Sequence, residues 1–440
     1  MKKLLFSAAI LASASLQAQN PAYENLRYLT KTIGARLSGS ENAQKAVEWG
    51  KKVMEDSGFD TVYLQPVMVP HWERGKIESA FIHSKEGTRV LSVKTLGGSV
   101  GTADTLIRAG IVEVKSFTEL EKLGREKIAG KVVLFNRPMD PKFKDTFKAY
   151  SGAVDQRGDG AWQAARYGAV AVMVRSMSLK QDLFAHTGSL HYKDSIPRIP
   201  AIAVSTTDAD WISQNLTGDQ DQKAVIKLSA KWYEDAPSYN VIGELKGSTK
   251  RNEIIVIGGH LDSWDVGEGA HDDGAGIVHS IEAVRLLKAE KYKPKHTIRC
   301  VLFMNEENGN RGGQRYAFVA DSLKEKHVAA IESDRGGFAP ESFSIDGDTA
   351  LISKWQKFLP ALKPYGISEI YAGYGGVDIG PLKKYNPSIP LVGFAPESTH
   401  YFDYHHADSD RLEAVDPKEL EDGAKACSKM IRLLDNEMSR

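Results

Sequence analysis

Carboxylates and histidines follow three apolar runs of this sequence and gather again in two polar segments. The residues concerned are His260 and Asp262, Asp272 and Asp273, Glu306 and Glu307, Glu332 and Asp334, and His405 and His406. Any one of these side chains would be ordinary at a strand end or in a loop exposed to water. Several carboxylates buried together, however, raise one another's pKa and are costly unless a cation compensates their charge. The pattern therefore indicates a metal site.

Mixed imidazole and carboxylate donors favour zinc, whereas calcium prefers more oxygen ligands and no histidine. The number of donors suits two zinc ions that share a carboxylate. A water held between two such ions, about 3.5–4 Å apart, ionises near neutral pH, because one zinc alone lowers the pKa of bound water to about 7. Adjacent residues at a strand end point in different directions, so one of Glu306 and Glu307 can bind metal while the other faces the substrate. We expect Glu306 to take the proton from the water.

Strands and amphipathic helices must alternate to position these residues, and the sequence from Tyr239 onwards has that pattern. The predicted strands lie at 253–263, 297–307 and 328–334, and the predicted helices at 274–290, 315–326 and 416–438. Apolar strands separated by amphipathic helices predict a mixed, mostly parallel α/β sheet sandwiched by helices. The candidate residues fall at the carboxyl ends of the strands, where ligands bind in open α/β sheets.

Residues 101–236 have a different pattern of short strands, turns and extended segments. KIAGKVVLFNRP is typical of a short strand with turn residues after it, GAWQAARYGAVAVMVRS of a helix that leads into a strand, and IPRIPAIAVS of an extended segment. We interpret this stretch as a separate, smaller α/β lobe, inserted into a main domain formed by residues 19–100 and 237–440. Helical spacing of apolar residues predicts two helices at the start of the main domain, the second ending near Gly58.

Residues 1–18 are typical of a secretory signal peptide, because Lys2 and Lys3 precede an apolar run at 4–14. That run is far shorter than the roughly 20 residues needed to span a bilayer, so no membrane span is expected. We expect export to the periplasm or the extracellular space. Lys and Arg number 57, equal to Asp and Glu, so no basic surplus indicates nucleic acid or anionic lipid as a partner. Cys300 and Cys427 are the two cysteines, too few for a disulfide framework, and whether they pair stays open.

Nine short segments of the chain carry a resemblance to a known family. They are VPHWERG (69–75), KVVLFNRP, HTG (186–188), IPRIPA, GGHLDSWDVGEGAHDDGAG, NEENG, ESD (332–334), GGVDI (375–379) and HHADSD. In these segments the chain resembles the clan MH zinc metallopeptidases, and most closely the plasma glutamate carboxypeptidase (carboxypeptidase Q) family. The segments span nearly the whole chain after the signal peptide. The resemblance implies that the inserted lobe is a protease-associated domain and that the protein can form a homodimer.

The resemblance also implies a role for each candidate ligand. Asp272 would bridge two zinc ions; His260 and Asp334 would complete one set of ligands, and Glu307 and His406 the other. His406 is selected over His405 because the family's ligand lies four residues before the Asp that matches Asp410.

Two further features of the site are implied by the same resemblance. Glu306 becomes the general base, and Asp262 would orient His260 through its other ring nitrogen. The peptide bond between Asp272 and Asp273 is expected to be cis.

Four residues have roles that we state as hypotheses. His405 could stabilise the oxyanion formed during hydrolysis, where several relatives have Tyr, or it could be merely structural. Asp378 could contact a substrate amino terminus, although a turn-forming Asp is the simpler interpretation. Arg311 and Arg335 could bind a substrate carboxylate, but their context, NGNRGG and SDRGG, departs from the family pattern.

The sequence therefore predicts a secreted, di-zinc exopeptidase that hydrolyses dipeptides or other short peptides, in which a zinc-bound water attacks the scissile carbonyl. An aminopeptidase is the alternative, since no residue decides which peptide end is anchored. A glutaminyl cyclase-type acyltransferase, which uses one zinc, and a binding protein without catalysis are less favoured, because all five ligand positions and Glu306 are present.

Overall fold

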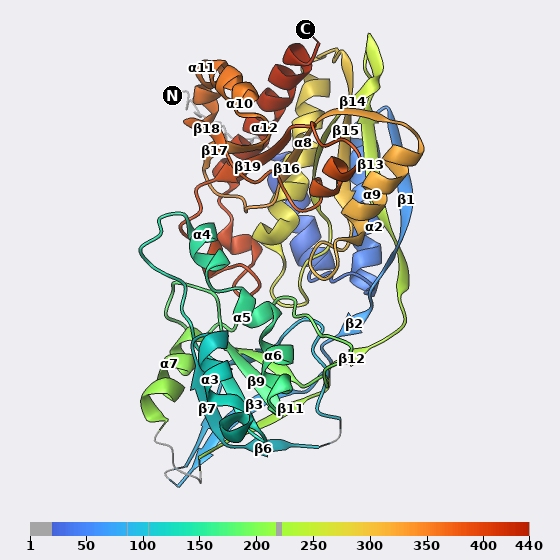
Figure 1. Cartoon of the computed structure of the whole chain (residues 1–440). Helices are drawn as coiled ribbons and strands as arrows, with labels where there is room; N and C mark the ends of the chain where they lie inside the picture. Colours follow the sequence, from blue (N-terminus) through green and yellow to red (C-terminus); the bar gives the residue numbers. More distant parts are fainter. Residues whose placement is uncertain (1–19, 86, 104, 217–221, 440) are drawn as a thin grey trace, which may run out of the picture.

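An eight-stranded mixed sheet forms the centre of the larger lobe (Figure 1). The structure, a computed structural model, describes residues 20–85, 87–103, 105–216 and 222–439, so the predicted signal peptide at 1–18 lies outside the described residues. The strand order is β1 (Thr61–Val69), β13 (Ala236–Leu245), β15 (His296–Phe303), β14 (Lys250–His260), β16 (Lys326–Ser333), β19 (Leu391–Pro396), β17 (Pro340–Asp346) and β18 (Glu369–Ala372). The neighbouring strands β15, β14, β16 and β19 are parallel, and β1 and β13 pair antiparallel with their neighbours. β17 is antiparallel to β19 but parallel to β18.

Helices cover both faces of this sheet, which confirms the predicted fold class. One face packs against α1 (Pro21–Arg27), α2 (Glu41–Asp56), α8 (Ala275–Ala289) and α12 (Pro417–Glu437), and the other against α9 (Arg311–Ser322). Alternation along β14 divides its side chains between the two cores, since Ile255 and Ile257 join the first, and Ile254 and Val256 the second. Burial on both faces explains why the central strands read as unbroken apolar runs.

The remaining helices at the edge of the larger lobe are short. α10 (Thr349–Trp355) and α11 (Leu359–Leu362) lie between β17 and β18 in the chain. α1 continues into a π-helical turn at Tyr28–Ile33, and an irregular turn at Ala270–Gly274, in which Asp272 and Asp273 have non-helical backbone angles, leads into α8. α12 begins at Pro417 behind Asp416, whose carboxylate accepts hydrogen bonds from the first backbone N–H groups. The predicted closing helix is therefore confirmed.

Two smaller sheets form the second lobe, in the lower half of Figure 1. The five-stranded sheet has the order β5 (Val93–Thr95), β10 (Ala201–Val204), β9 (Ala171–Arg175), β8 (Val132–Phe135) and β7 (Ile111–Val114). The four-stranded sheet has the order β4 (Gly87–Val90), β3 (Glu78–Ser84), β11 (Lys223–Leu228) and β6 (Ile107–Ala109). The helices of this lobe are α3 (Phe117–Ile128), α4 (Thr146–Ser151), α5 (Asp155–Gly158), α6 (Gly160–Arg166) and α7 (Thr206–Asn215).

The smaller sheets begin before the boundary that we predicted at residue 101. β3 pairs with β11 and β5 with β10, so residues 78–95 belong to the smaller lobe by their strand pairing. These partners are far apart in the chain, and hydrophobic periodicity carries no information about such pairs. A two-stranded ribbon of β2 (Trp72–Glu73) and β12 (Lys231–Trp232) joins the lobes where the chain passes between them.

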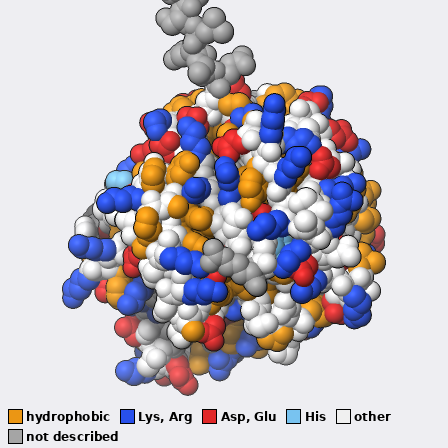
Figure 2. Space-filling view, turned by 90° about the horizontal axis from the view of Figure 1, so that it is seen from above, with side chains coloured by type: hydrophobic (Ala, Val, Ile, Leu, Met, Phe, Trp, Pro, Cys, Tyr) orange, Lys and Arg blue, Asp and Glu red, His pale blue; other side chains and the backbone are white. Residues whose placement is uncertain are grey.

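Cys300 and Cys427 are both buried free thiols, so the question of a bridge between them is answered. No helix in the described part of the chain is long and apolar enough to cross a membrane. On the face seen in Figure 2, acidic side chains lie among basic ones.

Candidate metal centre

The parallel strands bring most of the predicted residues to one edge of the main sheet. β14 ends at His260, β15 is followed closely by Glu306 and Glu307, and β16 is followed directly by Asp334. β15, β14 and β16 are neighbours in the sheet, so their carboxyl ends lie side by side. The predicted placement at the carboxyl edge of the sheet is therefore what the structure has.

Asp272 lies between two groups of candidate ligands, directly before α8. Its Oδ1 is 3.1 Å from Nε2 of His260, and its Oδ2 is 3.2 Å from Nε2 of His406. Asp334 Oδ1 is 3.3 Å from the same His260 nitrogen, and Glu307 Oε2 is 3.1 Å from the same His406 nitrogen. Two three-residue sets therefore share one carboxylate, each using one of its oxygens.

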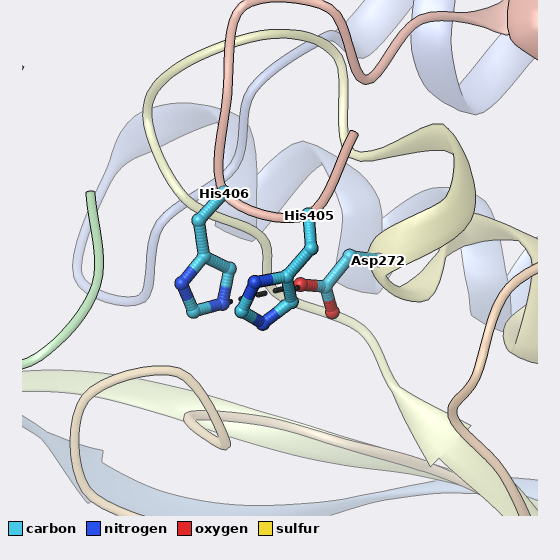
Figure 3. A group of neighbouring side chains, drawn as sticks. All are labelled: Asp272, His405 and His406. Atoms are coloured by element: carbon cyan, nitrogen blue, oxygen red, sulfur yellow. Dashed lines mark ion pairs between the residues drawn. The ribbon is translucent and has the colours of Figure 1, made fainter. Parts of the chain in front are cut away.

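His405 stacks on His406, and Figure 3 shows both rings beside the Asp272 carboxylate. The ring centroids are 3.5 Å apart, and His405 Nε2 is 3.7 Å from Asp272 Oδ2. Ligand atoms of these three residues all lie within 4.8 Å of one another, as do those of His260, Asp272 and Asp334. His406 is nearer than His405 to Asp272 and also contacts Glu307.

Two aspartates that received no role from the sequence hold the backbone around Asp272. Asp410 accepts hydrogen bonds from the N–H groups of His271 and Asp272, at 2.7 and 3.2 Å. Asp273 accepts from the N–H of His260 at 2.9 Å. The peptide bond between Asp272 and Asp273 is cis, as the resemblance implied. In the sequence, Asp410 was only the reference position from which His406 was identified as the ligand. Its spacing from the ligands does not predict that it accepts hydrogen bonds from their backbone.

Asp262 contacts the other ring nitrogen of His260 through its backbone and not through its carboxylate. Nδ1 of His260 is 3.0 Å from the backbone carbonyl oxygen of Asp262, whereas the Asp262 carboxylate is 3.9 Å away. The carboxylate accepts instead from the backbone N–H groups of Asn305 at 2.7 Å and Glu306 at 3.1 Å. Asn305 has a positive φ of 75°, so Asp262 stabilises the turn that presents Glu306. The sequence does not distinguish the two contacts, since a residue two positions from a histidine offers its carbonyl as readily as its side chain.

Glu307 and the loop after β14 are fixed by backbone contacts. The N–H of Trp264 donates to Glu307 Oε1 at 3.0 Å, which leaves Oε2 facing His406. Arg36 is fully buried and donates to three backbone carbonyls of this loop, those of Leu261, Glu268 and Gly269. No motif indicated Arg36, because its partners are backbone atoms that any residue type could supply.

The smaller lobe holds the loop that carries the two histidines. Nδ1 of His186 is 2.7 Å from the His405 carbonyl oxygen, and the N–H of Thr187 donates to the His406 carbonyl oxygen at 2.9 Å. The Thr187 carbonyl lies 3.3 Å from Nδ1 of His406. His406 has a positive φ of 61°, and these bonds hold it in that conformation. His186 and Thr187 belong to the HTG segment that carried part of the family resemblance, and in the structure this segment contacts the histidine loop.

Aromatic residues of α4 form one wall of a cavity of about 320 Å³ at this site. Phe147 stacks on Tyr401 with centroids 5.1 Å apart, and Tyr150 stacks on Phe402 at 4.7 Å. Tyr150 also meets the ring of His405 edge-on at 5.3 Å. The smaller lobe therefore supplies part of the cavity wall and packs against the histidine loop.

The site contains more carboxylates than its own cations balance. Burial raises the pKa of the Glu306 carboxyl well above its usual range, and the Asp334 charge raises it further. Burial and Asp334 likewise raise the pKa of Glu332. Burial alone would lower the pKa of His260, but Asp334 and Asp272 hold it well above its usual range. Buried carboxylates that repel one another in this way need bound cations to be ionised together.

The chemistry of the two sets fits zinc. Each set offers one imidazole nitrogen and two carboxylate groups, which are common zinc ligands. Oδ2 of Asp272 is buried and has no hydrogen-bond partner among the described residues, so it is free to accept a metal. His260 and His406 each turn Nδ1 to a backbone carbonyl, an arrangement that leaves Nε2 for a cation.

The three residues that were predicted to contact substrate, Asp378, Arg311 and Arg335, are not members of the two ligand sets. Asp378 is buried, and its N–H donates to Glu332, which also accepts from Val377 and Ile379. Arg335 lines the cavity, whereas Arg311 forms an ion pair with Asp235 in a separate groove. The structure therefore separates the two arginines that the sequence could not distinguish.

Comparisons with known proteins agree along nearly the whole chain. The sequence profile of peptidase family M28 matches residues 240–431. Carboxypeptidase Q of Bos taurus is 33% identical over 404 residues, which are 92% of this chain and 83% of that protein. The crystal structure of a peptidase M28 precursor from Shewanella amazonensis has a TM-score of 0.90 and 34% identity, covering 95% of this chain and 94% of that one. A zinc aminopeptidase from Bacillus subtilis shares the fold, with a TM-score of 0.67, 20% identity and 94% coverage of both chains.

Proposed function

Because the chain belongs to peptidase family M28 and is a zinc metallopeptidase, we propose that it is a di-zinc exopeptidase of short peptides. The proposed ligands are the members of the two sets, namely His260, Asp272 and Asp334 for one ion and Asp272, Glu307 and His406 for the other. The position of the Asp272 carboxylate carries this proposal, because its two oxygens face different histidines at 3.1 and 3.2 Å. A one-ion site would need only one of these sets.

The chain's own residues supply the proton transfers of the proposed reaction. Bound zinc supplies Lewis acidity at the scissile carbonyl and at the attacking water. Glu306, which lines the cavity beside the ligands, accepts the proton of that water on its carboxylate and then delivers it to the leaving amine. Asp262 positions Glu306 through the Glu306 N–H. His405, also in the cavity wall, is proposed to donate a hydrogen bond to the oxyanion.

Short peptides are the proposed substrates. The cavity of about 320 Å³ is at the lower end of the range of small-molecule sites, about 300–1,000 Å³. The smaller lobe, which we propose to be a protease-associated domain, restricts access by placing Phe147 and Tyr150 over the site. The carboxypeptidase Q relative supports cleavage beside a free carboxyl end.

Release of amino-terminal residues is a second candidate. Glu332 and Asp334 line the same cavity, and carboxylates there suit the ammonium group of a peptide. A dipeptide has both ends free and satisfies either description. We further propose that the protein is exported through the signal peptide at 1–18 and that it forms a homodimer.

Zinc content and peptide hydrolysis, measured together on the purified full chain, test this proposal. We expect two zinc ions per chain by mass spectrometry and cleavage of free dipeptides. Tripeptides blocked at either end then reveal which terminus is required. One zinc per active chain, with cyclisation of amino-terminal glutamine, would instead favour the acyltransferase. Two bound zinc ions without any peptide hydrolysis would contradict the proposal.

A further inference from the structure

Two arginines line the cavity, and they differ in what they contact. Arg157 is buried and uses its guanidinium on the backbone carbonyls of Ser189 and Thr187, at 3.3 and 3.5 Å. Arg335 is partly exposed, and its polar contacts are long, 3.4 Å to the Tyr371 hydroxyl and 3.5 Å to the Tyr374 carbonyl. Arg335 therefore keeps most of its hydrogen-bonding capacity free.

The Arg335 guanidinium also differs from that of Arg311 in its charged neighbours. Within the described part of the chain, no carboxylate oxygen lies within 4.0 Å of a guanidinium nitrogen of Arg335, the distance limit for an ion pair. Arg311, in contrast, is paired with Asp235. The group lies over the Phe147 ring, 5.0 Å from its centroid. A planar guanidinium held against an aromatic ring keeps its N–H edge available for bidentate binding of a carboxylate.

Arg335 lines the same cavity as the proposed metal ligands. It directly follows Asp334, whose carboxylate is 3.3 Å from His260. One peptide residue spans at most about 3.6 Å, so the carboxyl end of a dipeptide stays near the metal ligands. The rest of the wall is rich in carboxylates, among them Glu306 and Glu332, and would repel a substrate anion.

We propose that Arg335 is a specificity-determining residue that binds a carboxylate of the substrate residue on the leaving side of the scissile bond. The inference rests on the proposed hydrolysis of short peptides. The anion is the terminal carboxylate of the peptide, because it is the one that every dipeptide carries at this distance. An acidic side chain of the leaving residue offers the same chemistry, and the substrates below distinguish the two sources.

The test compares Arg335→Met with the wild type on Leu-Ala, Leu-Ala amide and Leu-Glu amide. Arg311→Met is the matched control, because it removes an arginine that is paired elsewhere. We expect the wild type to prefer Leu-Ala to its amide, and Arg335→Met to lose about 10- to 100-fold in kcat/KM on Leu-Ala alone, since hydrogen bonds between charged groups are strong. Arg335→Lys should retain part of the preference. Zinc content should not change.

Each outcome bears on the proposal. A preference for Leu-Ala that survives in Arg335→Met overturns it, and so does an equal loss on all three substrates. A loss confined to Leu-Glu amide assigns Arg335 to an acidic side chain. Calorimetric binding of alanine and alaninamide, the products of the leaving side of Leu-Ala and its amide, provides a readout that needs no catalysis. If the wild type binds alanine more tightly than alaninamide and Arg335→Met does not, the subsite stands even where hydrolysis fails.

Discussion

Thr187 is hydrogen bonded to His406 through both of its backbone polar groups. Its N–H donates to the His406 carbonyl oxygen at 2.9 Å, and its carbonyl oxygen is 3.3 Å from Nδ1 of the same histidine. A proton on Nδ1 leaves the lone pair on Nε2, which faces Asp272 and Glu307. The smaller lobe thus orients a proposed metal ligand of the larger one.

Gly188→Ala should disturb this contact. A Cβ at Gly188 would lie 2.7 Å from Nδ1 of His406 and 2.4 Å from Nη1 of Arg157. We expect zinc binding to weaken about 10- to 100-fold, as for changes next to metal ligands elsewhere. Gly87→Ala is the control, because Gly87 has φ +134°, close to the +131° of Gly188, and an added Cβ there meets no described residue within 4 Å apart from its chain neighbours. Equal zinc content in the two variants would contradict the expectation.

Glu306→Gln and Glu307→Gln should separate the base from a ligand. Glu306→Gln removes the proton acceptor, so kcat should fall about 10²- to 10⁴-fold while zinc content stays unchanged. Glu307→Gln weakens a contact on the His406 side, so zinc content itself should fall. Metal analysis and initial rates on one dipeptide measure both effects. Normal turnover by Glu306→Gln would remove it from the mechanism.

His405→Ala tests whether this histidine is catalytic, structural or a ligand. Oxyanion stabilisation predicts a fall in kcat of about 10²- to 10³-fold with zinc content retained. Loss of zinc would assign His405 to the metal, and an unchanged kcat would leave it only a packing role against His406. His400→Ala is the control in the same loop, because His400 is exposed and contacts Asp403.

Removal of zinc should destabilise the protein as well as inactivate it. Without cations the carboxylates around Asp272 repel one another, and ions that bind only the folded state stabilise it by mass action. At zinc 100-fold above its Kd this stabilisation is about 2.7 kcal/mol. Differential scanning calorimetry should therefore find a lower Tm after chelation and recovery on adding zinc. The same Tm with and without metal would contradict a buried cation site.

Asp435 predicts a pH dependence of stability far from the site. It accepts hydrogen bonds from the N–H of His296 at 2.9 Å and from Tyr292 at 2.7 Å. Although burial opposes it, these hydrogen bonds lower the pKa of Asp435. The contribution is complete above the unfolded pKa of about 3.9 and disappears as the pH falls through the lower folded pKa. Asp435→Asn should cost about 1.5–3 kcal/mol at pH 7. Urea unfolding should find a smaller difference below pH 4.

The sequence predicted most of the side chains at this site but few of the contacts that hold them in place. His260 and Asp334 could be found because they end or follow apolar runs, and runs of that kind become neighbouring parallel strands. Thr187 and Asp410 could not, because their contacts involve backbone atoms and depend on how distant segments pack. The start of the smaller sheets at Glu78 was missed for the same reason, since β3 pairs with a strand more than a hundred residues later.

The shared carboxylate of Asp272 makes the affinities of the two proposed ions interdependent. An ion at His260 would withdraw electron density from the oxygen that faces His406, and it would also fix the orientation of that oxygen. Any factor by which the first ion changes the affinity for the second acts equally in reverse, because the two binding free energies are linked. The two proposed positions would therefore behave as one thermodynamic unit, and a change at residue 272 would alter the occupancy of both.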